Sequence, residues 1–469
     1  MTITTELSKM AKALTFDDLS EEVIDRTKYL LLDFVGLAAR GNHYESNAPI
    51  LNYVKRQGLT GNGVVIGNDG ETYQPHYAAL LNGAAAHSLE LDDVINEASL
   101  HPAVVIFPTA LAQSVNSKRS GKDVLVASIL GYEVMGRIGK AMNPSSLYSR
   151  GFHPTGLVGT FGAIATSAKL MDLSVEETVN AYGVGGSQTS ASMEFLNTDT
   201  WTKRFHPGWA AHNGLFASGI ASLGFTGPKT IIEGDRGFAK SYASDYSLTS
   251  IGNDFKLKES YVLKTSIKPH ACCRYKQAPL DIILSLVNKH NIQPDEVESV
   301  TIDLVKTALP IVALPEEIKR NPQSTEDAQF SMHYGAAVAV LYRKTLLEQY
   351  ENSVIQQDAV TKMMKNIHCR HEPKLDSNFP IKWPARVSIQ TTRGTFYDEI
   401  DYPKGDPENP LTWDELIEKF RYVTEPIYSF DQQTTIIETI RNLENINEIN
   451  QLNEQDLFNG GVKKWRQFS

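Results

Sequence analysis

The chain has 469 residues, of which 41% are hydrophobic and 21% charged, an ordinary globular composition, and its length predicts two domains. The formal net charge of -10 argues against binding to nucleic acid or to an anionic membrane surface. An anionic substrate stays open, because a pocket can be locally basic in an acidic protein. Met1–Met10 carry no secretion signal, and no apolar run approaches roughly 18 residues, so we expect a cytoplasmic protein without a membrane span.

The first half of the chain reads as helices. Leu30, Phe34 and Leu37 share one helical face, and Ser174 with Glu177 forms a capping box that predicts a helix start. Further helices rich in small residues are expected at four places, namely Ala78–His87, Lys122–Ile138, Gly159–Leu170 and Ala210–Leu223.

The pattern changes after about Leu263. A helix over Gln277–His290 precedes a strand over Val297–Leu304, and Arg386–Tyr402 reads as a hairpin with a turn at Arg393-Gly394. Helices are expected at Asp327–Tyr342, Gln357–Ile367, from Thr412 onward and at Asp431–Leu443. This order fits a mainly α protein with three parts: a helical domain over 1–264, a smaller α/β domain over 265–402, and a C-terminal helical part over 403–469.

The segment His87–Pro102 is unusually rich in titratable groups. Glu90 and Asp93 are three residues apart, so we expect both on one helical face, and His101 follows in a loop before Pro102. These groups suit acid–base chemistry, but helix capping and a buried structural histidine explain the pattern equally well.

Two further segments of the first half carry candidate groups. His153 precedes a small-residue helix, whose N-terminus favours an anion. Lys203, Arg204 and His206 place three cationic groups within four residues, a carboxylate clamp flanked by Trp201 and Trp209, although a solvated basic loop is the plainer alternative.

The second half adds three candidates. Cys273 is either an acid–base group or a small apolar residue, and Arg274 could bind a carboxylate. Tyr334 could donate a hydrogen bond or a proton, or simply be a buried aromatic residue.

No metal or cofactor site is expected. Cys272, Cys273 and Cys369 lack the spacing of an iron–sulfur cluster and read as free thiols, and His368–His371 reads as a polar loop. Gly183–Gly186 lacks the full glycine fingerprint of a nucleotide loop.

Taken in order, several segments resemble the MmgE/PrpD family, which includes 2-methylcitrate dehydratase, cis-aconitate decarboxylase and iminodisuccinate epimerase. The segments that carry the resemblance are Asp33–Gly36, Asn82–His87, Glu90–Asp93, His101-Pro102, Gly151–Gly156, Thr202–His206 and Ser331–Tyr334. The resemblance implies a homodimer, a large all-helical domain with an inserted α/β lid, and a cofactor-independent active site between the two domains.

Carried over residue by residue, the resemblance implies a lyase or isomerase that abstracts a proton α to a carboxylate of a small di- or tricarboxylic acid. His101, His153 and Lys203 would transfer protons and bind carboxylates, with Cys273 in the lid and Tyr334 orienting or protonating the substrate. Glu90 and Asp93 belong to the same implied site, and Arg204, His206 and Arg274 are further candidates for substrate binding. Glu90, Val94, Cys273 and the loop Ile95–Leu100 depart from the decarboxylase and dehydratase patterns, and the Ala98–Pro102 segment is similar to the epimerase branch. A cis-aconitate decarboxylase-like activity and a non-catalytic carboxylate-binding homologue are the alternatives.

Overall fold

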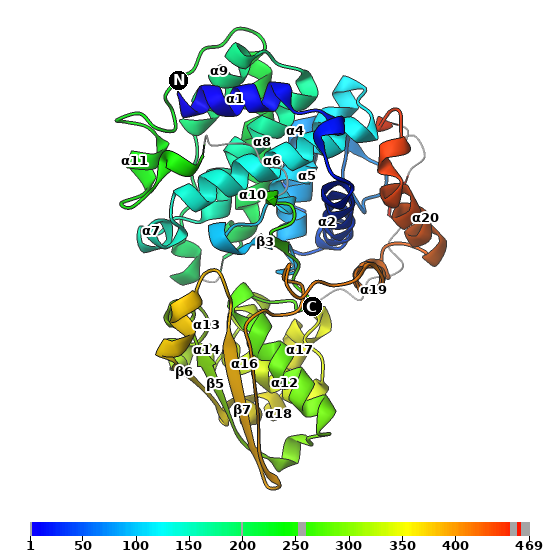
Figure 1. Ribbon diagram of the computed structural model, residues 1–469. Helices are drawn as coiled ribbons and strands as arrows, with labels where there is room; N and C mark the ends of the chain where they lie inside the picture. The colour runs from blue at the N-terminus through cyan, green and yellow to red at the C-terminus, as the bar shows by residue number, and fades with distance from the viewer. Residues whose placement is uncertain (1, 198–199, 252–258, 451–456, 461–469) are drawn as a thin grey trace. The chain divides into compact units, whose positions relative to one another are not determined.

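The computed structural model describes residues 2–197, 200–251, 259–450 and 457–460, which form two compact units. Unit 1 holds the described parts of Met1–Ser88, Asp92–Thr265 and Thr412–Trp465, and unit 2 holds Leu89–Leu91 and Ser266–Leu411. Helices dominate the chain, as Figure 1 shows, so the expectation of a mainly α protein is confirmed.

Unit 1 is built from helices and a few very short strands. Its helices are α1 (Ile3–Ala13), α2 (Glu21–Gly41), α3 (Ala48–Arg56), α4 (Pro75–His87), α5 (Ala103–Ser117), α6 (Gly121–Ala141), α7 (Pro144–Ser149), α8 (Pro154–Met171), α9 (Val175–Gly186), α10 (Thr202–Ala221), α11 (Phe238–Tyr242), α19 (Trp413–Thr424) and α20 (Phe430–Arg441). Strands β1 (Thr60–Val64) and β2 (Thr72–Tyr73) pair antiparallel, and β3 spans Val94–Ile95. The chain passes from unit 1 to unit 2 within β4 (Thr265–Ser266).

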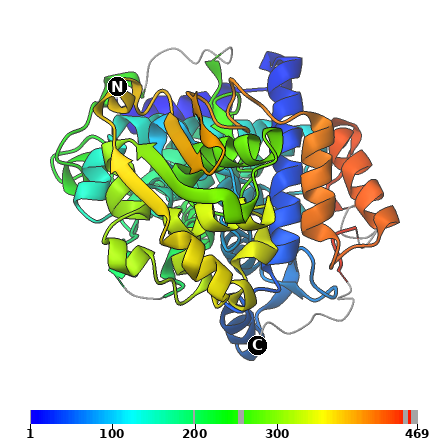
Figure 2. The same ribbon diagram turned by 90° about the horizontal axis from the view of Figure 1, so that it is seen from below.

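The C-terminal helices pack against the N-terminal helix α2, so the two ends of the sequence share one unit. Figure 2 shows α19 and α20, in orange and red, beside α2 in blue. A Cβ added at Gly36 of α2 would come within 2.9 Å of Phe420, which shows how closely α2 and α19 approach. Lys419 Nζ of α19 lies 2.7 Å from Asp33 Oδ1 of α2, and both side chains are at least nine-tenths buried. The Asp33–Gly36 segment thus joins the two ends of the chain.

Helices α4, α5, α8 and α10 form the densest part of unit 1. A Cβ at Gly83 of α4 would lie 2.6 Å from the carbonyl oxygen of Val104, and one at Gly208 of α10 would lie 2.2 Å from that of Leu80. Only glycine permits such close approach of one backbone to another. The small residues of these helices therefore pack tightly, as the sequence predicts.

Unit 2 is an α/β unit around a four-stranded sheet in the order β6-β5-β7-β8. The strands are β5 (Val297–Leu304), β6 (Ile367–His371), β7 (Ala385–Thr391) and β8 (Gly394–Ile400). Strand β6 is parallel to β5, whereas β5–β7 and β7–β8 are antiparallel, with Ile302 opposite Cys369 and Val387. The helices are α12 (Gln277–Lys289), α13 (Leu309–Val312), α14 (Glu316–Lys319), α15 (Thr325–Gln329), α16 (Met332–Tyr342), α17 (Asn352–Ile355) and α18 (Asp358–Met364). Alternate residues of β7 are buried, and α12 packs on β7 and β8 while α16 packs on β6.

Three expectations for unit 2 are wrong in detail. The helix expected over Asp327–Tyr342 is two helices, because Ser331 caps a new one: its side chain accepts a hydrogen bond from Tyr334 N. The helix expected over Gln357–Ile367 ends at Met364, and Ile367 already begins β6. His368–His371 is therefore a strand and not a polar loop, since pairing with β5 outweighs its polar composition.

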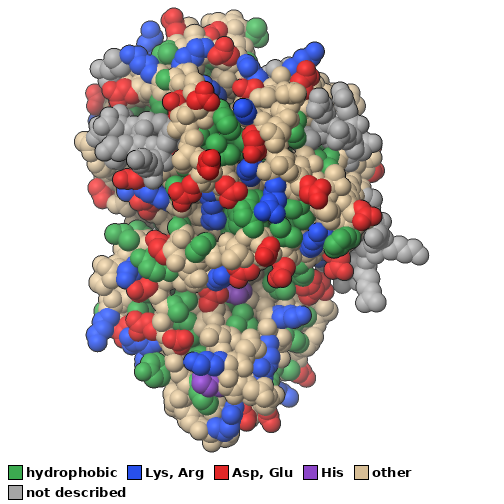
Figure 3. All heavy atoms as spheres, turned by 45° about the vertical axis from the view of Figure 1, so that its right-hand side comes forward, with side chains coloured by type: hydrophobic (Ala, Val, Ile, Leu, Met, Phe, Trp, Pro, Cys, Tyr) green, Lys and Arg blue, Asp and Glu red, His purple; other side chains and the backbone are tan. Residues whose placement is uncertain are grey.

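On the face drawn in Figure 3, acidic and basic side chains are interspersed over the described surface. None of the helices formed by the described residues combines the length and the apolarity that crossing a bilayer requires.

The buried pair between Asp33 and Lys419 yields a stability prediction. Lys419→Met leaves the Asp33 carboxylate buried without this partner, so we expect the free energy of unfolding to fall by about 3 kcal/mol in urea denaturation. Replacing both residues, with Asp33→Leu added to Lys419→Met, should recover most of that loss. The matched control is Lys240→Met, which removes an exposed pair with Asp235 and should leave the urea midpoint unchanged. An equal loss in the single and double variants would contradict this account.

Candidate active site

The site in unit 1 begins where α4 ends. His87 is the last residue of α4, and its side chain is completely buried. Beyond it, the chain leaves the helix and reaches His101 just before α5. The expectation that Glu90 and Asp93 share a helical face is therefore wrong, because neither residue lies in a helix. Tight packing of α4 against α5 and α10 fixes both ends of this segment in the interior.

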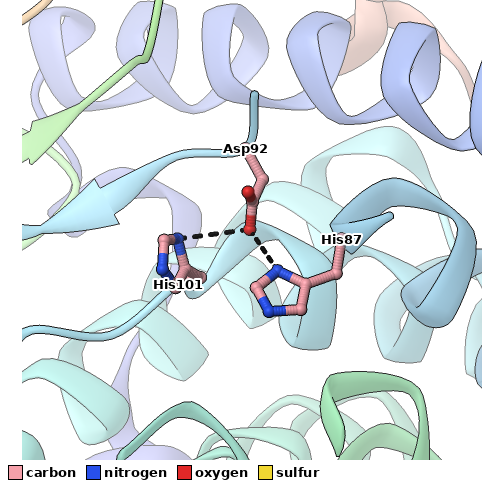
Figure 4. Close-up of side chains that lie close together, drawn as sticks. All are labelled: His87, Asp92 and His101. Atoms are coloured by element: carbon pink, nitrogen blue, oxygen red, sulfur yellow. Dashed lines mark hydrogen bonds and ion pairs between the residues drawn. The ribbon is translucent and has the colours of Figure 1, made fainter. Parts of the chain in front are cut away.

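Asp92 holds two histidines, as Figure 4 shows. Its Oδ2 lies 2.6 Å from His87 Nδ1 and 3.2 Å from His101 Nδ1, and the Asp92 side chain is fully buried. His101 Nδ1 also lies 2.5 Å from the carbonyl oxygen of Asp93, which can only accept a hydrogen bond. Nδ1 of His101 therefore carries the proton, and in the neutral ring Nε2 carries the lone pair.

The same reasoning applies to His87. Its Nδ1 donates to the Asp92 carboxylate, so the lone pair of the neutral ring lies on Nε2. Among the described residues, His87 Nε2 is buried without a hydrogen-bond partner. Both rings thus have the tautomer of a general base, and Asp92 is placed to stabilise either one after it takes a proton.

Two more histidines extend the cluster. His153 lies at the N-terminus of α8 and His206 in the second turn of α10, with their Nδ1 atoms 3.2 Å apart, so one donates and the other accepts. The His153 ring stacks on His87 at a centroid distance of 5.8 Å, and His87 lies 5.1 Å from His101. Phe195 packs edge-on against His153 and His206. Four imidazoles, from the segment His87–Pro102 and from the starts of α8 and α10, therefore meet in the core of unit 1.

Burial keeps two of these imidazoles neutral. Loss of solvation lowers the pKa of His153 well below its usual value, and the neighbouring His206, His87 and Lys203 lower it further. Loss of solvation lowers the pKa of His206 to about 4, with smaller effects from His87 and Lys203. Near pH 7 both rings are therefore uncharged and can accept a proton.

Asp93 has a different environment from Asp92. Its Oδ1 accepts a hydrogen bond from Ala103 N at the start of α5, and its Oδ2 accepts one from the Tyr132 hydroxyl at 2.7 Å. Burial raises the pKa of Asp93 to about 8 despite these two bonds. The carboxyl group therefore anchors α5 to α6, and its expected role in substrate binding stays a prediction.

The predicted site residues of unit 2 form a separate set. Glu90 is buried, has a left-handed backbone with φ of 55°, and pairs with Lys268 at 3.5 Å. Such a conformation is unusual for a residue other than glycine and persists only where surrounding contacts enforce it. Gln329 helps to enforce this conformation of Glu90, because its Nε2 donates hydrogen bonds to the carbonyl oxygens of Leu89 and Ala271.

Cys273, Arg274 and Tyr334 are also buried in unit 2. Cys273 N donates to the carbonyl oxygen of Gln329 at 3.1 Å. Arg274 Nη2 lies 2.5 Å from Asp406 Oδ1, and its guanidinium lies over the Trp383 ring. The Tyr334 hydroxyl donates to the carbonyl oxygen of Gln349 at 2.5 Å, and burial raises the pKa of Tyr334 above its usual value. These contacts fix the side chains of Arg274 and Tyr334 and the backbone of Cys273, and the catalytic or binding roles of the three residues stay predictions.

His87, Asp92 and His101 also form a group that could hold a metal ion, with ligand atoms within 4.8 Å of one another. The 2.6 Å between His87 Nδ1 and Asp92 Oδ2 is a hydrogen-bond length. Ligand atoms about 2.0–2.1 Å from a tetrahedral zinc ion would lie farther apart than that. The geometry therefore fits a proton shared between nitrogen and oxygen better than a metal centre.

Comparison with known protein families shows to which family this chain belongs. Residues 5–250 match the MmgE/PrpD N-terminal domain and residues 270–445 match the MmgE/PrpD C-terminal domain. The chain belongs to the MmgE/PrpD family. The resemblance drawn from the ordered motifs is thereby confirmed.

Several characterised members of the family are similar over nearly the full length. The chain is 29% identical to a cis-aconitate decarboxylase-like protein of Aspergillus oryzae, covering 94% of both chains. It is 28% identical to the cis-aconitate decarboxylase of Homo sapiens, covering 94% of this chain and 92% of the relative. It is 23% identical to the 2-methylcitrate dehydratase of Escherichia coli, covering 91% of both.

Sequence reasoning placed His101, His153, Lys203 and His206 among the site candidates of this MmgE/PrpD protein, and the structure brings them together. It missed His87 and Asp92, although both lie in the segment that it singled out. The sequence does contain a pattern that points to both residues, because a histidine ends an apolar helix and two adjacent acids follow five and six residues later. It also missed Lys268, which is fully buried beside Glu90.

The Asp93–Tyr132 hydrogen bond gives a second stability prediction. Tyr132→Phe leaves a buried carboxyl oxygen without its donor, so we expect a loss of about 1–3 kcal/mol in the free energy of unfolding. Tyr182→Phe is the matched control: among the described residues, the buried Tyr182 hydroxyl has no hydrogen-bond partner. Its removal should be neutral or stabilising in the same denaturation assay. Equal losses in the two variants would show that the hydroxyl of Tyr132 is not what matters.

The buried neutral histidines also predict how stability depends on pH. The pKa of His206 is about 4 when folded and about 6.5 when unfolded, so the unfolded chain binds the extra proton first as pH falls. His206 therefore favours the folded state above pH 6.5 and loses about 1.4 kcal/mol of that contribution per pH unit between pH 6.5 and 4.

Urea titrations between pH 7 and 4 test this expectation. His206→Gln should flatten the slope of unfolding free energy against pH, whereas the exposed His368→Gln should retain the wild-type slope. A wild-type slope in His206→Gln would show that His206 is not held neutral in the folded protein.

Proposed function

We propose that the protein is a lyase or isomerase that moves a proton α to a carboxylate of a small di- or tricarboxylic acid. The observation that carries the proposal is the cluster of four imidazoles around the buried Asp92. Removing a proton next to a carboxylate needs a base that is neutral at working pH and a cation that stabilises the negative charge formed. His153, which burial keeps neutral, meets the first requirement, and His101 carries its lone pair on Nε2 in the neutral ring. Lys203 and Arg204 on α10 supply the second.

The individual roles follow from the contacts. Asp92 orients His101 and compensates its charge once it is protonated. His153 shares a proton with His206, and burial keeps its ring neutral and so available as a base. We further propose that unit 2 is the α/β lid of the family, with Cys273 and Tyr334 as its acid and orienting groups and with Glu90 and Arg274 for carboxylate recognition.

Two reactions of this family begin by removing a proton α to a carboxylate, whereas a third, decarboxylation, only delivers a proton to the carbon. In a dehydration, a base takes the α-proton while an acid protonates the departing hydroxyl group. In a decarboxylation, carbon dioxide leaves and an acid protonates the carbon that remains. In an epimerisation, a proton is removed from one face of the carbon and returned to the other. Because the relatives named cis-aconitate decarboxylase are 27–28% identical to this chain, against 22–23% for those named 2-methylcitrate dehydratase, cis-aconitate is the first substrate to test.

The experiment is a substrate panel in deuterated water, read by mass spectrometry and NMR. The panel holds cis-aconitate, 2-methylcitrate and aspartate-derived dicarboxylates. Loss of carbon dioxide or water identifies a lyase, and deuterium incorporation without other change identifies an epimerase. Binding seen as a thermal shift, with no turnover of any member, would contradict the proposal and leave a carboxylate-binding homologue.

The role of Asp92 predicts a catalytic effect. Asp92→Asn keeps the shape of the side chain but removes the charge that stabilises a protonated His101, so we expect turnover to fall at least about 100-fold. His290→Gln, at the end of α12, is the control and should keep wild-type turnover. Thermal unfolding of both variants checks that the fold survives. Asp92→Asn with more than half of the wild-type turnover would exclude this role for the carboxylate.

A further inference from the structure

Gln329 joins two segments of unit 2 that carry candidate site residues. It is the last residue of α15, and its side chain is only 1% exposed. Its hydrogen bonds reach Leu89, which is 240 residues away in the sequence, and Ala271, which is 58 residues away. Glu90 directly follows the first of these residues, and Cys273 lies two residues after the second. The proposed chemistry assigns no role to Gln329.

The contacts fix the orientation of the Gln329 amide. Its Nε2 donates to the carbonyl oxygens of Leu89 at 3.2 Å and of Ala271 at 3.1 Å. A carbonyl oxygen only accepts hydrogen bonds, so exchanging Nε2 and Oε1 would leave three acceptors facing one another. The buried Oε1 has no hydrogen-bond partner among the described residues. Within the described chain, Nε2 thus makes both hydrogen bonds of this side chain.

The first segment, Leu89–Leu91, depends on other parts of unit 2 for its conformation. It belongs to unit 2, although the residues on both sides of it belong to unit 1. Its central residue, Glu90, has a φ of 55°, which a residue other than glycine keeps only where surrounding contacts enforce it. The bond from Gln329 to the Leu89 carbonyl group and the ion pair with Lys268 supply such contacts.

The second segment, His270–Cys273, is held by two buried glutamines. The side chain of Gln277 makes hydrogen bonds to backbone atoms of this segment. Gln329 binds the segment twice, through Nε2 to the Ala271 carbonyl group and through its own carbonyl oxygen, which accepts a hydrogen bond from Cys273 N at 3.1 Å. Gln329 also reaches the first segment, a contact that Gln277 does not make within the described chain.

We infer that Gln329 is a positioning residue, which holds Glu90 and Cys273 in fixed places relative to each other. This inference rests on the proposed function, in which both residues act on the substrate. Groups that act on one molecule must keep their separation, and a displacement of about 1 Å can cost a factor of about 100 in rate. A single amide that donates to both segments is a short connection between them, and its burial keeps water from replacing either hydrogen bond.

Gln329→Met tests the role in catalysis. Methionine has a similar length but no hydrogen-bond donor, so we expect kcat/KM on the substrate found in the panel to fall at least about 100-fold. The matched control is Gln433→Met in α20, because Gln433 is also buried and its Nε2 donates to the Arg421 carbonyl oxygen and to Thr424 Oγ1. The control should lower the temperature of thermal unfolding as Gln329→Met does, and keep at least half of the wild-type kcat/KM. Folded Gln329→Met with wild-type kcat/KM would overturn the inference.

Gln329→Glu, which keeps the size of the side chain, gives a second activity readout. A carboxyl group donates a hydrogen bond only while it is protonated, and burial raises the pKa of a carboxyl group. We therefore expect the kcat/KM of Gln329→Glu, relative to wild type at the same pH, to rise as the pH is lowered from 8 to 6. The control Gln433→Glu should show no such trend. A ratio that stays constant in Gln329→Glu would contradict the role assigned to Nε2.

Hydrogen exchange read by mass spectrometry tests the connection without a substrate. Gln329→Met should speed exchange in peptides that cover residues 88–92 and in those that cover residues 270–273. Gln277→Met removes contacts to the second segment and should speed exchange in residues 270–273 while leaving residues 88–92 unchanged. Unchanged exchange at residues 88–92 in Gln329→Met would overturn the inference, even if that variant is less stable than wild type.

Failure of the inference can be told apart from failure of the proposed function. If no panel member is turned over, or if Glu90→Gln and Cys273→Ser keep wild-type turnover, the proposed roles in unit 2 are wrong and the inference fails with them. If these two variants lose turnover while folded Gln329→Met keeps it, the proposed function stands and the inference alone is wrong.

Discussion

Asp92 is the constraint on which the site depends. A fully buried carboxylate is costly unless it is paired, and the partners of its Oδ2 are the imidazoles of His87 and His101. The carboxylate sets which nitrogen of His87 carries a proton, and the Asp93 carbonyl sets the same for His101. The tautomers that make these rings bases are thus a consequence of satisfying one buried charge and one carbonyl group.

The histidines can meet because the helices that carry them approach so closely. His87 ends α4, His153 begins α8 and His206 lies near the start of α10. Glycines at the crossing points let these backbones come nearer than any side chain would permit, as at Gly83 and Gly208. The dense packing also removes water, which keeps His153 and His206 neutral. The close packing of the helices in unit 1 therefore both brings the histidines together and keeps two of them uncharged.

Unit 2 buries charge as well, and here the buried groups include several cations. Lys268 pairs with Glu90, Arg274 pairs with Asp406, and Lys276 donates to the carbonyl oxygen of Ala328 at 2.9 Å. Burial lowers the pKa of Lys276 to about 8, so a small rise in pH above neutral is enough to remove its charge. Two of these three buried cations are thus balanced by buried carboxylates, and the third is held by a carbonyl oxygen.

The sequence by itself determined several helices of the first half, namely α2, α4, α6, α8 and α9, together with β5, the hairpin of β7 and β8, and the family. These features depend on local periodicity, on capping residues such as Ser174, and on the order of short motifs. The helix expected over Ala210–Leu223 already begins at Thr202, so Lys203 and Arg204 lie in a helix and not in a loop. Strand β6 could not be predicted, because a polar segment becomes a strand only when a buried neighbour such as β5 offers hydrogen bonds. Likewise, only the tertiary structure showed that Asp92 serves the two histidines while Asp93 anchors α5. Two adjacent carboxylates are identical in the sequence, and they differ only in which side chains the fold brings within hydrogen-bond reach.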